Sequence, residues 1–251
     1  MTGSSAKRVT AAVLIIGDEI LSGRTQDTNL RDIAKYLGVH GVDLAEARTV
    51  SDVHEEIVGA LDALRGRYDY VITTGGIGPT HDDITADAVA KAFGVPIDID
   101  PRARAVMADY YASRGIELTP ARLRMARIPD GATLVKNEIS AAPGFMIGNV
   151  IVMAGVPSIM KVMLNDVTRH LQHGAPVESR TIEVAHPEGE IAELFGAHAK
   201  AFPDIAMGSY PQRKDGRLST QLVLRCPNIQ RLDDAERGLI AILTSKGLIA
   251  R

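Results

Sequence analysis

The sequence predicts a soluble α/β protein whose sheet is mostly parallel, followed by a small α+β domain. Two observations carry this prediction. Over the first part of the chain, continuous apolar runs alternate with helical patterns of about 10–15 residues, as expected for βαβ units with strands covered on both faces. Beyond a break at Gln172–Pro176, the order changes to strand, helix, strand, strand, helix. We therefore expect two domains, residues 1–174 and 175–251.

The first domain is expected to begin with three strand–helix units. Each strand is an apolar run, and each helix carries apolar residues three and four positions apart. Gly38 is expected to end the first helix, and Asp52 is a candidate N-cap of the second. In chain order the expected elements are strand Val9–Ile16, helix Asn29–Leu37, strand Val42–Val50, helix Val53–Leu64, strand Tyr70–Thr74 and helix His81–Phe93.

The remaining elements follow from the same patterns. Two apolar runs, Phe145–Ile147 and Val150–Met153, flank Gly148-Asn149 and predict either a hairpin or a strand with a tight turn. Further helices of the first domain are expected near Arg102–Ser113, Pro120–Ala126 and Pro157–Leu171. The second domain is expected to contain strand Arg180–Ala185, helix Glu188–Lys200, strands Ile205–Tyr210 and Leu218–Arg225, and helix Asp233–Ser245.

Composition and charge exclude several classes of protein. The formal net charge of -3 leaves no basic field for nucleic acid or an anionic membrane. The single cysteine, Cys226, cannot form an internal disulfide and favours a reducing compartment. Met1–Lys7 lacks the apolar core of a signal peptide, and Val9–Ile16 is too short to span a bilayer. We therefore expect a cytoplasmic protein with neither nucleic acid nor a membrane as its partner.

The segment Thr73–Thr85, TTGGIGPTHDDIT, carries the strongest functional pattern in the chain. It leaves the carboxyl end of a buried strand and opens a helix, which is where open α/β sheets bind ligands. Its three glycines let backbone N–H groups approach a ligand. Thr80 and Asp83 have the spacing of a capping box at the start of a helix, where free N–H groups favour an anion such as phosphate. The segment is neither a Walker loop nor a Rossmann fingerprint.

The acidic residues near this segment have more than one possible role. Asp82 and Asp83 suit a helix N-terminus for structural reasons alone, but adjacent carboxylates beside a phosphate also suit a divalent cation such as Mg²⁺. Asp18 and Glu19 follow the first strand and are expected at the same sheet edge, unless they lie in a solvated loop. Asp52 follows the second strand and is a candidate helix cap, a role that does not prevent it from also serving a site.

GGIGPTHDDIT resembles the signature of the molybdopterin-binding fold shared by the MogA and MoaB proteins. Its Pro-Thr-x-Asp-Asp form is most similar to the N-terminal region of CinA-type proteins, and a similar domain occurs in eukaryotic FAD synthases. The resemblance extends over nearly the whole chain. The further stretches that carry it are GDEILSG at Gly17–Gly23 with Asp27-Thr28-Asn29, Val50-Ser51-Asp52, APGF at Ala142–Phe145, GVPS at Gly155–Ser158 and G-x-Y-P at Gly208–Pro211.

This resemblance implies a three-layer MogA-like fold over residues 1–174, a small CinA-type domain over 175–251, and a homo-oligomer, either a dimer or a trimer. It implies a phosphorylated pterin or nucleotide as the ligand, and a nucleotide pyrophosphatase that acts on ADP-ribose-like substrates with Mg²⁺, Mn²⁺ or Co²⁺. The alternative is a non-hydrolytic protein that binds molybdopterin or serves molybdenum-cofactor biosynthesis. The candidate catalytic residues are Asp83, Asp52 and Asp82, with Asp82 and Asp83 also as metal ligands. The candidate ligand-binding residues are Gly75, Gly76, Gly78, Thr80, Asp18, Glu19 and Ser22.

The chain departs from the CinA-type pattern at two places. CinA-type chains carry a glutamate in the late loop where this chain has Ile159, which leaves no carboxylate there. The sequence ends at Arg251, so we expect neither the C-terminal amidase domain of full-length CinA nor its deamidation of nicotinamide mononucleotide.

Overall fold

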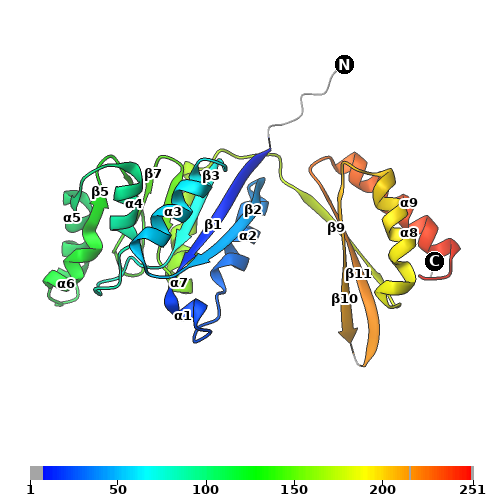
Figure 1. Cartoon of the computed structure of the whole chain (residues 1–251), viewed down its shortest axis with the longest axis horizontal. Helices are drawn as coiled ribbons and strands as arrows, with labels where there is room; N and C mark the ends of the chain where they lie inside the picture. Colours follow the sequence, from blue (N-terminus) through cyan, green and yellow to red (C-terminus); the bar gives the residue numbers. More distant parts are fainter. Residues whose placement is uncertain (1–7, 215, 250–251) are drawn as a thin grey trace, which may run out of the picture. The chain divides into compact units, whose positions relative to one another are not determined.

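The computed structural model describes residues 8–214 and 216–249 (Figure 1). The chain divides into two compact units, residues 1–174 and 175–251, each with its own apolar core. We describe each unit by itself.

The first unit is built around a six-stranded sheet. In spatial order its strands are β2 (Val42–Val50), β1 (Val9–Ile16), β3 (Tyr70–Thr74), β8 (Val150–Met153), β7 (Gly144–Ile147) and β6 (Thr133–Val135). The first four strands are mutually parallel, and β7 runs antiparallel to both of its neighbours. The mostly parallel sheet expected from the sequence is therefore confirmed, and so is the hairpin around Gly148-Asn149.

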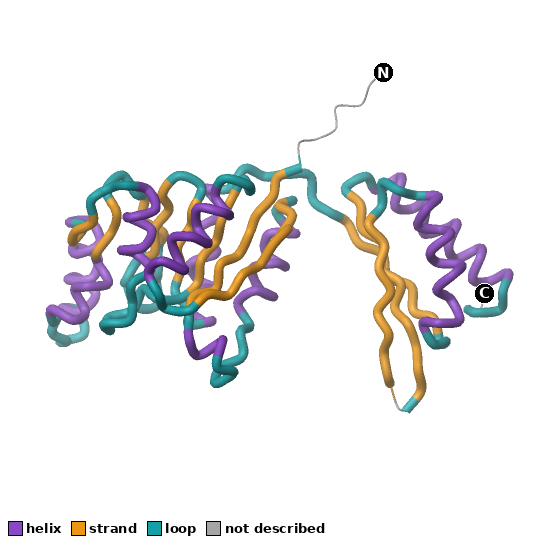
Figure 2. Tube along the Cα trace, in the orientation of Figure 1, coloured by secondary structure: helices purple, strands orange, loops and turns teal. Residues whose placement is uncertain are grey.

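Helices cover both faces of this sheet, which makes three layers (Figure 2). Successive residues of β1 point to opposite faces: Leu14 belongs to one apolar core and Val13 to the other. This double burial explains why the strand reads as a continuous apolar run. One face packs against α3 (His54–Arg65), α4 (Thr85–Phe93) and α5 (Pro101–Ala112), and the other against α2 (Asn29–Val39) and α7 (Pro157–Val167).

Short elements complete the first unit. They are α1 (Asp18–Leu21), α6 (Pro120–Leu123), the 3-10 turns η1 (Arg124–Ala126) and η2 (Thr168–His170), and a two-stranded ribbon of β4 (Ile97–Ile99) and β5 (Arg127–Pro129). Three of the strands, β4, β5 and β6, are not in the sequence-based expectation. Each has three residues, too few to show a periodic pattern.

The second unit is a three-stranded antiparallel sheet with two helices on one face (Figure 1). Its elements are β9 (Glu178–Val184), α8 (Glu188–Ala201), β10 (Ala206–Lys214), β11 (Arg217–Cys226) and α9 (Ile229–Ser245). The predicted order of strand, helix, strand, strand, helix is confirmed. Alternate residues of β11, such as Leu222 and Leu224, face the helices, where they meet Leu232 and Leu239 of α9.

Several predicted boundaries are wrong. Helix α9 begins at Ile229 rather than at Asp233, because Asn228 caps it, and strand β10 continues to Lys214 rather than ending at Tyr210. Helix α4 begins at Thr85 rather than at His81, and its N-cap position is Ile84 rather than Thr80, because Thr85 is tied to the preceding glycine loop. Asp52 does not cap α3; Val53 holds that position, and the Asp52 carboxylate accepts a hydrogen bond from another loop. Helix α2 continues through Gly38 to Val39.

Candidate functional site

The carboxyl ends of β1, β2, β3 and β8 meet at one edge of the sheet. The Gly17 N–H group donates to the Val50 carbonyl oxygen at 3.2 Å, which joins the loops after β1 and β2. The Gly75 N–H group donates to the Met153 carbonyl oxygen at 3.2 Å, which joins the loops after β3 and β8. Four loops that are distant in the sequence therefore converge around Gly75, as the parallel arrangement predicts.

The loop Gly75–Gly78 has a backbone that requires glycine at its first two positions. Gly75 has φ 104° and Gly76 has φ 65°, both in the left-handed region. A Cβ atom on Gly75 would collide with the carbonyl oxygen of Ile16, and a Cβ atom on Gly76 would collide with the hydroxyl of Thr85. The glycines are thus needed both for backbone conformation and for close packing against β1 and α4.

Thr85 orients this loop. Its hydroxyl donates to the Gly75 carbonyl oxygen at 2.9 Å, and its N–H group donates to the Gly76 carbonyl oxygen at 3.0 Å. Both carbonyl oxygens therefore accept a hydrogen bond from the first residue of α4. The N–H groups of Gly76, Ile77 and Gly78 donate no hydrogen bond to any residue that the structure describes.

The first turn of α4 adds to these donors. The N–H groups of Ala86 and Asp87 also have no partner among the described residues, because the first amides of a helix have no intrahelical acceptor. Both residues line the same cleft as Gly76, Ile77 and Gly78. Unpaired amides and the positive end of the helix dipole form an environment that favours an anion.

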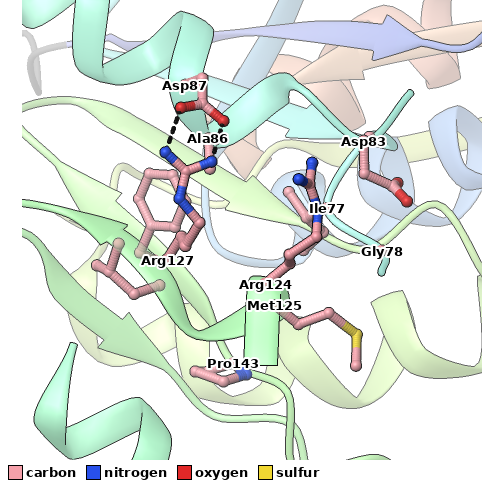
Figure 3. A pocket seen from close by; sticks show the side chains of 12 residues that line it. Ile77, Gly78, Asp83, Ala86, Asp87, Arg124, Met125, Arg127 and Pro143 are labelled. Atoms are coloured by element: carbon pink, nitrogen blue, oxygen red, sulfur yellow. Dashed lines mark hydrogen bonds and ion pairs between the residues drawn. The ribbon is translucent and has the colours of Figure 1, made fainter. Parts of the chain in front are cut away.

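A small cleft beside the loop is lined by two arginines that the sequence-based reasoning did not select (Figure 3). Arg127 forms a bidentate pair with Asp87, with both N–O distances 2.7 Å. Arg124, on η1, makes no hydrogen bond or ion pair with any described residue, and its side chain extends toward the loop at Ile77. Nothing in the local sequence around Arg124 connects it to the glycine loop, so no sequence signal could have selected it.

Acidic side chains from two other converging loops lie near Asp52. One of its carboxylate oxygens accepts a hydrogen bond of 2.9 Å from the Asp18 N–H group. Burial raises the pKa of Asp52 above its ordinary value, and the negative charges of Asp18, Glu19 and Asp82 raise it further against the opposing effect of that hydrogen bond. The structure therefore brings together four of the acidic residues that the sequence proposed, in an arrangement that favours a protonated carboxyl.

Asp83 and Thr80 close the turn that precedes α4. One Asp83 carboxylate oxygen accepts hydrogen bonds from the N–H group and the hydroxyl of Thr80. The same oxygen lies close to Gly78: a Cβ atom on Gly78 would be only 2.7 Å from it. The capping-box contact thus forms, but within the loop and not at the helix start. Hydrogen bonding from Thr80 lowers the pKa of Asp82, which is exposed.

The other predicted site residues are less closely tied to the loop. No hydrogen bond joins Ser22 to Gly75–Gly78; its hydroxyl donates to the Glu19 carbonyl oxygen at 3.4 Å. Within the described residues, 8–214 and 216–249, no group of three or more His, Cys, Asp or Glu side chains could hold a metal ion. Asp82 and Asp83 by themselves therefore do not form a ready metal site.

The late loop GVPS does reach the site. The Asn29 side-chain amide donates to the Gly155 carbonyl oxygen at 2.7 Å, and Gly155 packs against the Cα atom of Gly75. Ile159 is half-buried against the apolar core on the α7 side of the sheet, so the isoleucine has a packing role in this chain.

Comparisons with known proteins match both parts of the chain. The family described as "Probable molybdopterin binding domain" matches residues 12–173, and the family described as "FAD synthase, middle domain" matches residues 176–251. A protein of Aeropyrum pernix is 32% identical, and the match covers 91% of this chain and 93% of that protein. A CinA-like protein of Desulfosudis oleivorans is 35% identical over 79% of this chain, which spans only 51% of that relative's length.

A solved structure agrees with these matches. The crystal structure of the protein CinA from Thermoplasma acidophilum has a TM-score of 0.60 and 35% identity, and the match covers 65% of this chain and 98% of that one. No helix in the part of the chain that the structure describes is long and apolar enough to cross a membrane.

Proposed function

Because this chain belongs to the family of probable molybdopterin-binding domains, in the form found in CinA-like proteins, we propose that its Gly75–Gly78 loop binds the phosphate group of a phosphorylated pterin or nucleotide. One observation carries the proposal: three successive N–H groups of the loop, at Gly76, Ile77 and Gly78, have no hydrogen-bond partner among the described residues. They lie beside two further unpaired N–H groups at the start of α4.

The arrangement of these donors favours a phosphate over a neutral ligand. Thr85 holds the carbonyls of Gly75 and Gly76, so the loop needs no rearrangement to present its N–H groups. Donors that are already oriented lose little entropy on binding, and hydrogen bonds to a charged acceptor are roughly twice as strong as neutral ones. The glycines remove side chains that would keep a phosphate away from the backbone.

Calorimetric titration with matched ligands tests the proposal. We expect AMP to bind and adenosine not to bind, and a phosphorylated pterin to bind more tightly than the same pterin without its phosphate. The Gly76→Ala variant should lose binding of both phosphorylated ligands. Equal affinity for the phosphorylated and unphosphorylated members of both pairs would contradict a phosphate site.

A second candidate function, hydrolysis of an ADP-ribose-like diphosphate, is favoured by the surroundings of Asp52. In such a reaction a water molecule attacks one phosphorus atom, a carboxylate takes up the water proton, and the bond to the bridging oxygen breaks. A carboxyl with a raised pKa, as Asp52 has, is better matched to proton transfer near neutral pH than an ordinary aspartate.

A divalent cation could take part only together with the substrate. Asp82 and Asp83 supply at most two carboxylates, so phosphate oxygens and water would have to complete the shell, as is common for Mg²⁺. Such an ion would act as a Lewis acid on the phosphate. The test is incubation with ADP-ribose and Mg²⁺, Mn²⁺ or Co²⁺ while AMP release is followed. If the protein binds AMP but releases none from ADP-ribose with any of the three metals, the hydrolytic function is contradicted and the binding function is still supported.

A further inference from the structure

We propose that Arg124 is the specificity-determining residue of this site, and that it selects ligands that end in a phosphate monoester. The inference rests on the proposed binding of a phosphate at the Gly75–Gly78 loop. It goes beyond that proposal because it names the kind of phosphate and the side chain that recognises it.

The first argument is the state of the two arginines in the cleft. The Arg127 guanidinium is held by both carboxylate oxygens of Asp87, so its charge is offset. The Arg124 guanidinium is exposed and has no carboxylate partner among the described residues, and it extends toward the glycine loop (Figure 3). An arginine without a partner, facing unpaired backbone donors, lacks an acceptor that an anion would provide.

The second argument is the number of donors. Five residues of the loop and the first turn of α4 that line the cleft have N–H groups without a partner among the described residues, and the guanidinium of Arg124 adds its planar set of N–H donors from η1. A phosphate within a diester or an internal diphosphate has two terminal oxygens, whereas a monoester has three. Only the monoester can accept from the loop with two oxygens and from Arg124 with a third.

The third argument is charge. The same sheet edge carries the carboxylates of Asp18, Glu19, Asp52, Asp82 and Asp83. Their combined field opposes an incoming dianion, and among the described residues that line the cleft Arg124 is the cation whose charge is not offset by a carboxylate. Binding of a doubly charged phosphate therefore depends strongly on this one guanidinium.

The test is a set of titrations of the full chain with AMP, cyclic AMP, ADP-ribose and adenosine. The wild type should bind AMP more tightly than cyclic AMP or ADP-ribose. Loss of one charge-assisted hydrogen bond predicts that Arg124→Gln weakens AMP binding by about 10- to 100-fold and reduces the preference for AMP over cyclic AMP. Arg124→Lys keeps the charge but not the planar guanidinium, so its affinity for AMP should lie between those of the wild type and Arg124→Gln. Arg104→Gln removes an exposed charge from α5 and should leave AMP affinity unchanged.

The outcomes separate the two proposals. Arg124→Gln should keep the thermal stability of the wild type, because its side chain makes no bond to lose. Unchanged AMP affinity in a folded Arg124→Gln variant would overturn the role of Arg124, while loss of AMP binding in Gly76→Ala would still support the phosphate loop. Tighter binding of cyclic AMP or ADP-ribose than of AMP would overturn monoester selection. If the wild type binds no phosphorylated ligand at all, the proposed function and this inference both fail.

Discussion

The hydroxyl of Thr85 donates a 2.9 Å hydrogen bond to the carbonyl oxygen of Gly75 and thereby ties the first residue of α4 to the loop that precedes it. Thr85 is fully buried. Replacing it by valine keeps the shape but leaves the Gly75 carbonyl without this donor, so we expect the free energy of unfolding to fall by about 1–3 kcal/mol. Urea unfolding measures this loss.

The affinity for AMP should fall together with stability in Thr85→Val. Without the Thr85 hydroxyl, the Gly75 carbonyl is released and the conformation of the Gly75–Gly78 loop is no longer fixed. Thr85→Ser is the matched control: it keeps the hydroxyl and should retain AMP binding within a few-fold of the wild type. If Thr85→Val binds AMP as tightly as the wild type, the hydrogen bond to Gly75 is structural only.

Gly76 should tolerate no larger residue. An alanine there must adopt φ near 65° and collide with the Thr85 hydroxyl, so Gly76→Ala should lower the free energy of unfolding by at least about 1–2 kcal/mol, the cost of the left-handed conformation alone. Gly59 provides the matched control, because it lies within α3 with open space around its Cα atom. Gly59→Ala should stabilise the protein by about 0.5–1 kcal/mol. Thermal unfolding of both variants measures these changes. We expect the melting temperature to fall in Gly76→Ala and to rise in Gly59→Ala.

The raised pKa of Asp52 predicts how stability depends on pH. The folded protein holds a proton on this carboxyl more readily than the unfolded chain, so the stabilising contribution is complete below the ordinary pKa of 3.8 and is lost as pH rises through the folded value. Asp52→Asn is neutral at every pH and can still accept the Asp18 N–H bond. The stability of this variant relative to the wild type should therefore increase as the pH rises from 3.8 through the folded pKa of Asp52. Urea unfolding across that range checks the sign, and a constant or falling difference would contradict it.

The bidentate pair of Arg127 and Asp87 predicts coupled effects on stability. Each side chain is 30% exposed, and the removal of one leaves the other without its partner in a mostly buried position. Arg127→Met and Asp87→Asn should each lower the free energy of unfolding by about 1–3 kcal/mol, and the double variant should lose less than the sum. A double-mutant cycle measures the coupling, and additive losses would show that the pair contributes nothing.

Asp87→Asn should also change binding, in the opposite direction to its effect on stability. It frees the positive charge of Arg127 within the cleft that holds Arg124, so AMP affinity should rise several-fold. Titration at low and high salt distinguishes a charge effect, which salt screens, from a change in shape.

Most of the fold was accessible from the sequence, and the errors have definite causes. Strand β1 was predicted correctly because burial on both faces demands a continuous apolar run. Strand β6 was missed because its three residues form a strand only by pairing with β7. The start of α4 was misplaced because the Thr80–Asp83 spacing has the pattern of a cap, while the helix actually begins where Thr85 meets Gly75 and Gly76.

For the site, the sequence by itself determined the glycine loop and its position at the end of a strand. Short-range sterics decide which residues accept the backbone of Gly75 and Gly76, and such rules can be read from adjacent residues. Only the tertiary structure decided that Arg124 faces this loop without a partner, that Arg127 is neutralised, and that Asp52 lies among other carboxylates. These relationships join residues far apart in the chain. They depend on how helices and strands pack, which no local pattern of residues encodes.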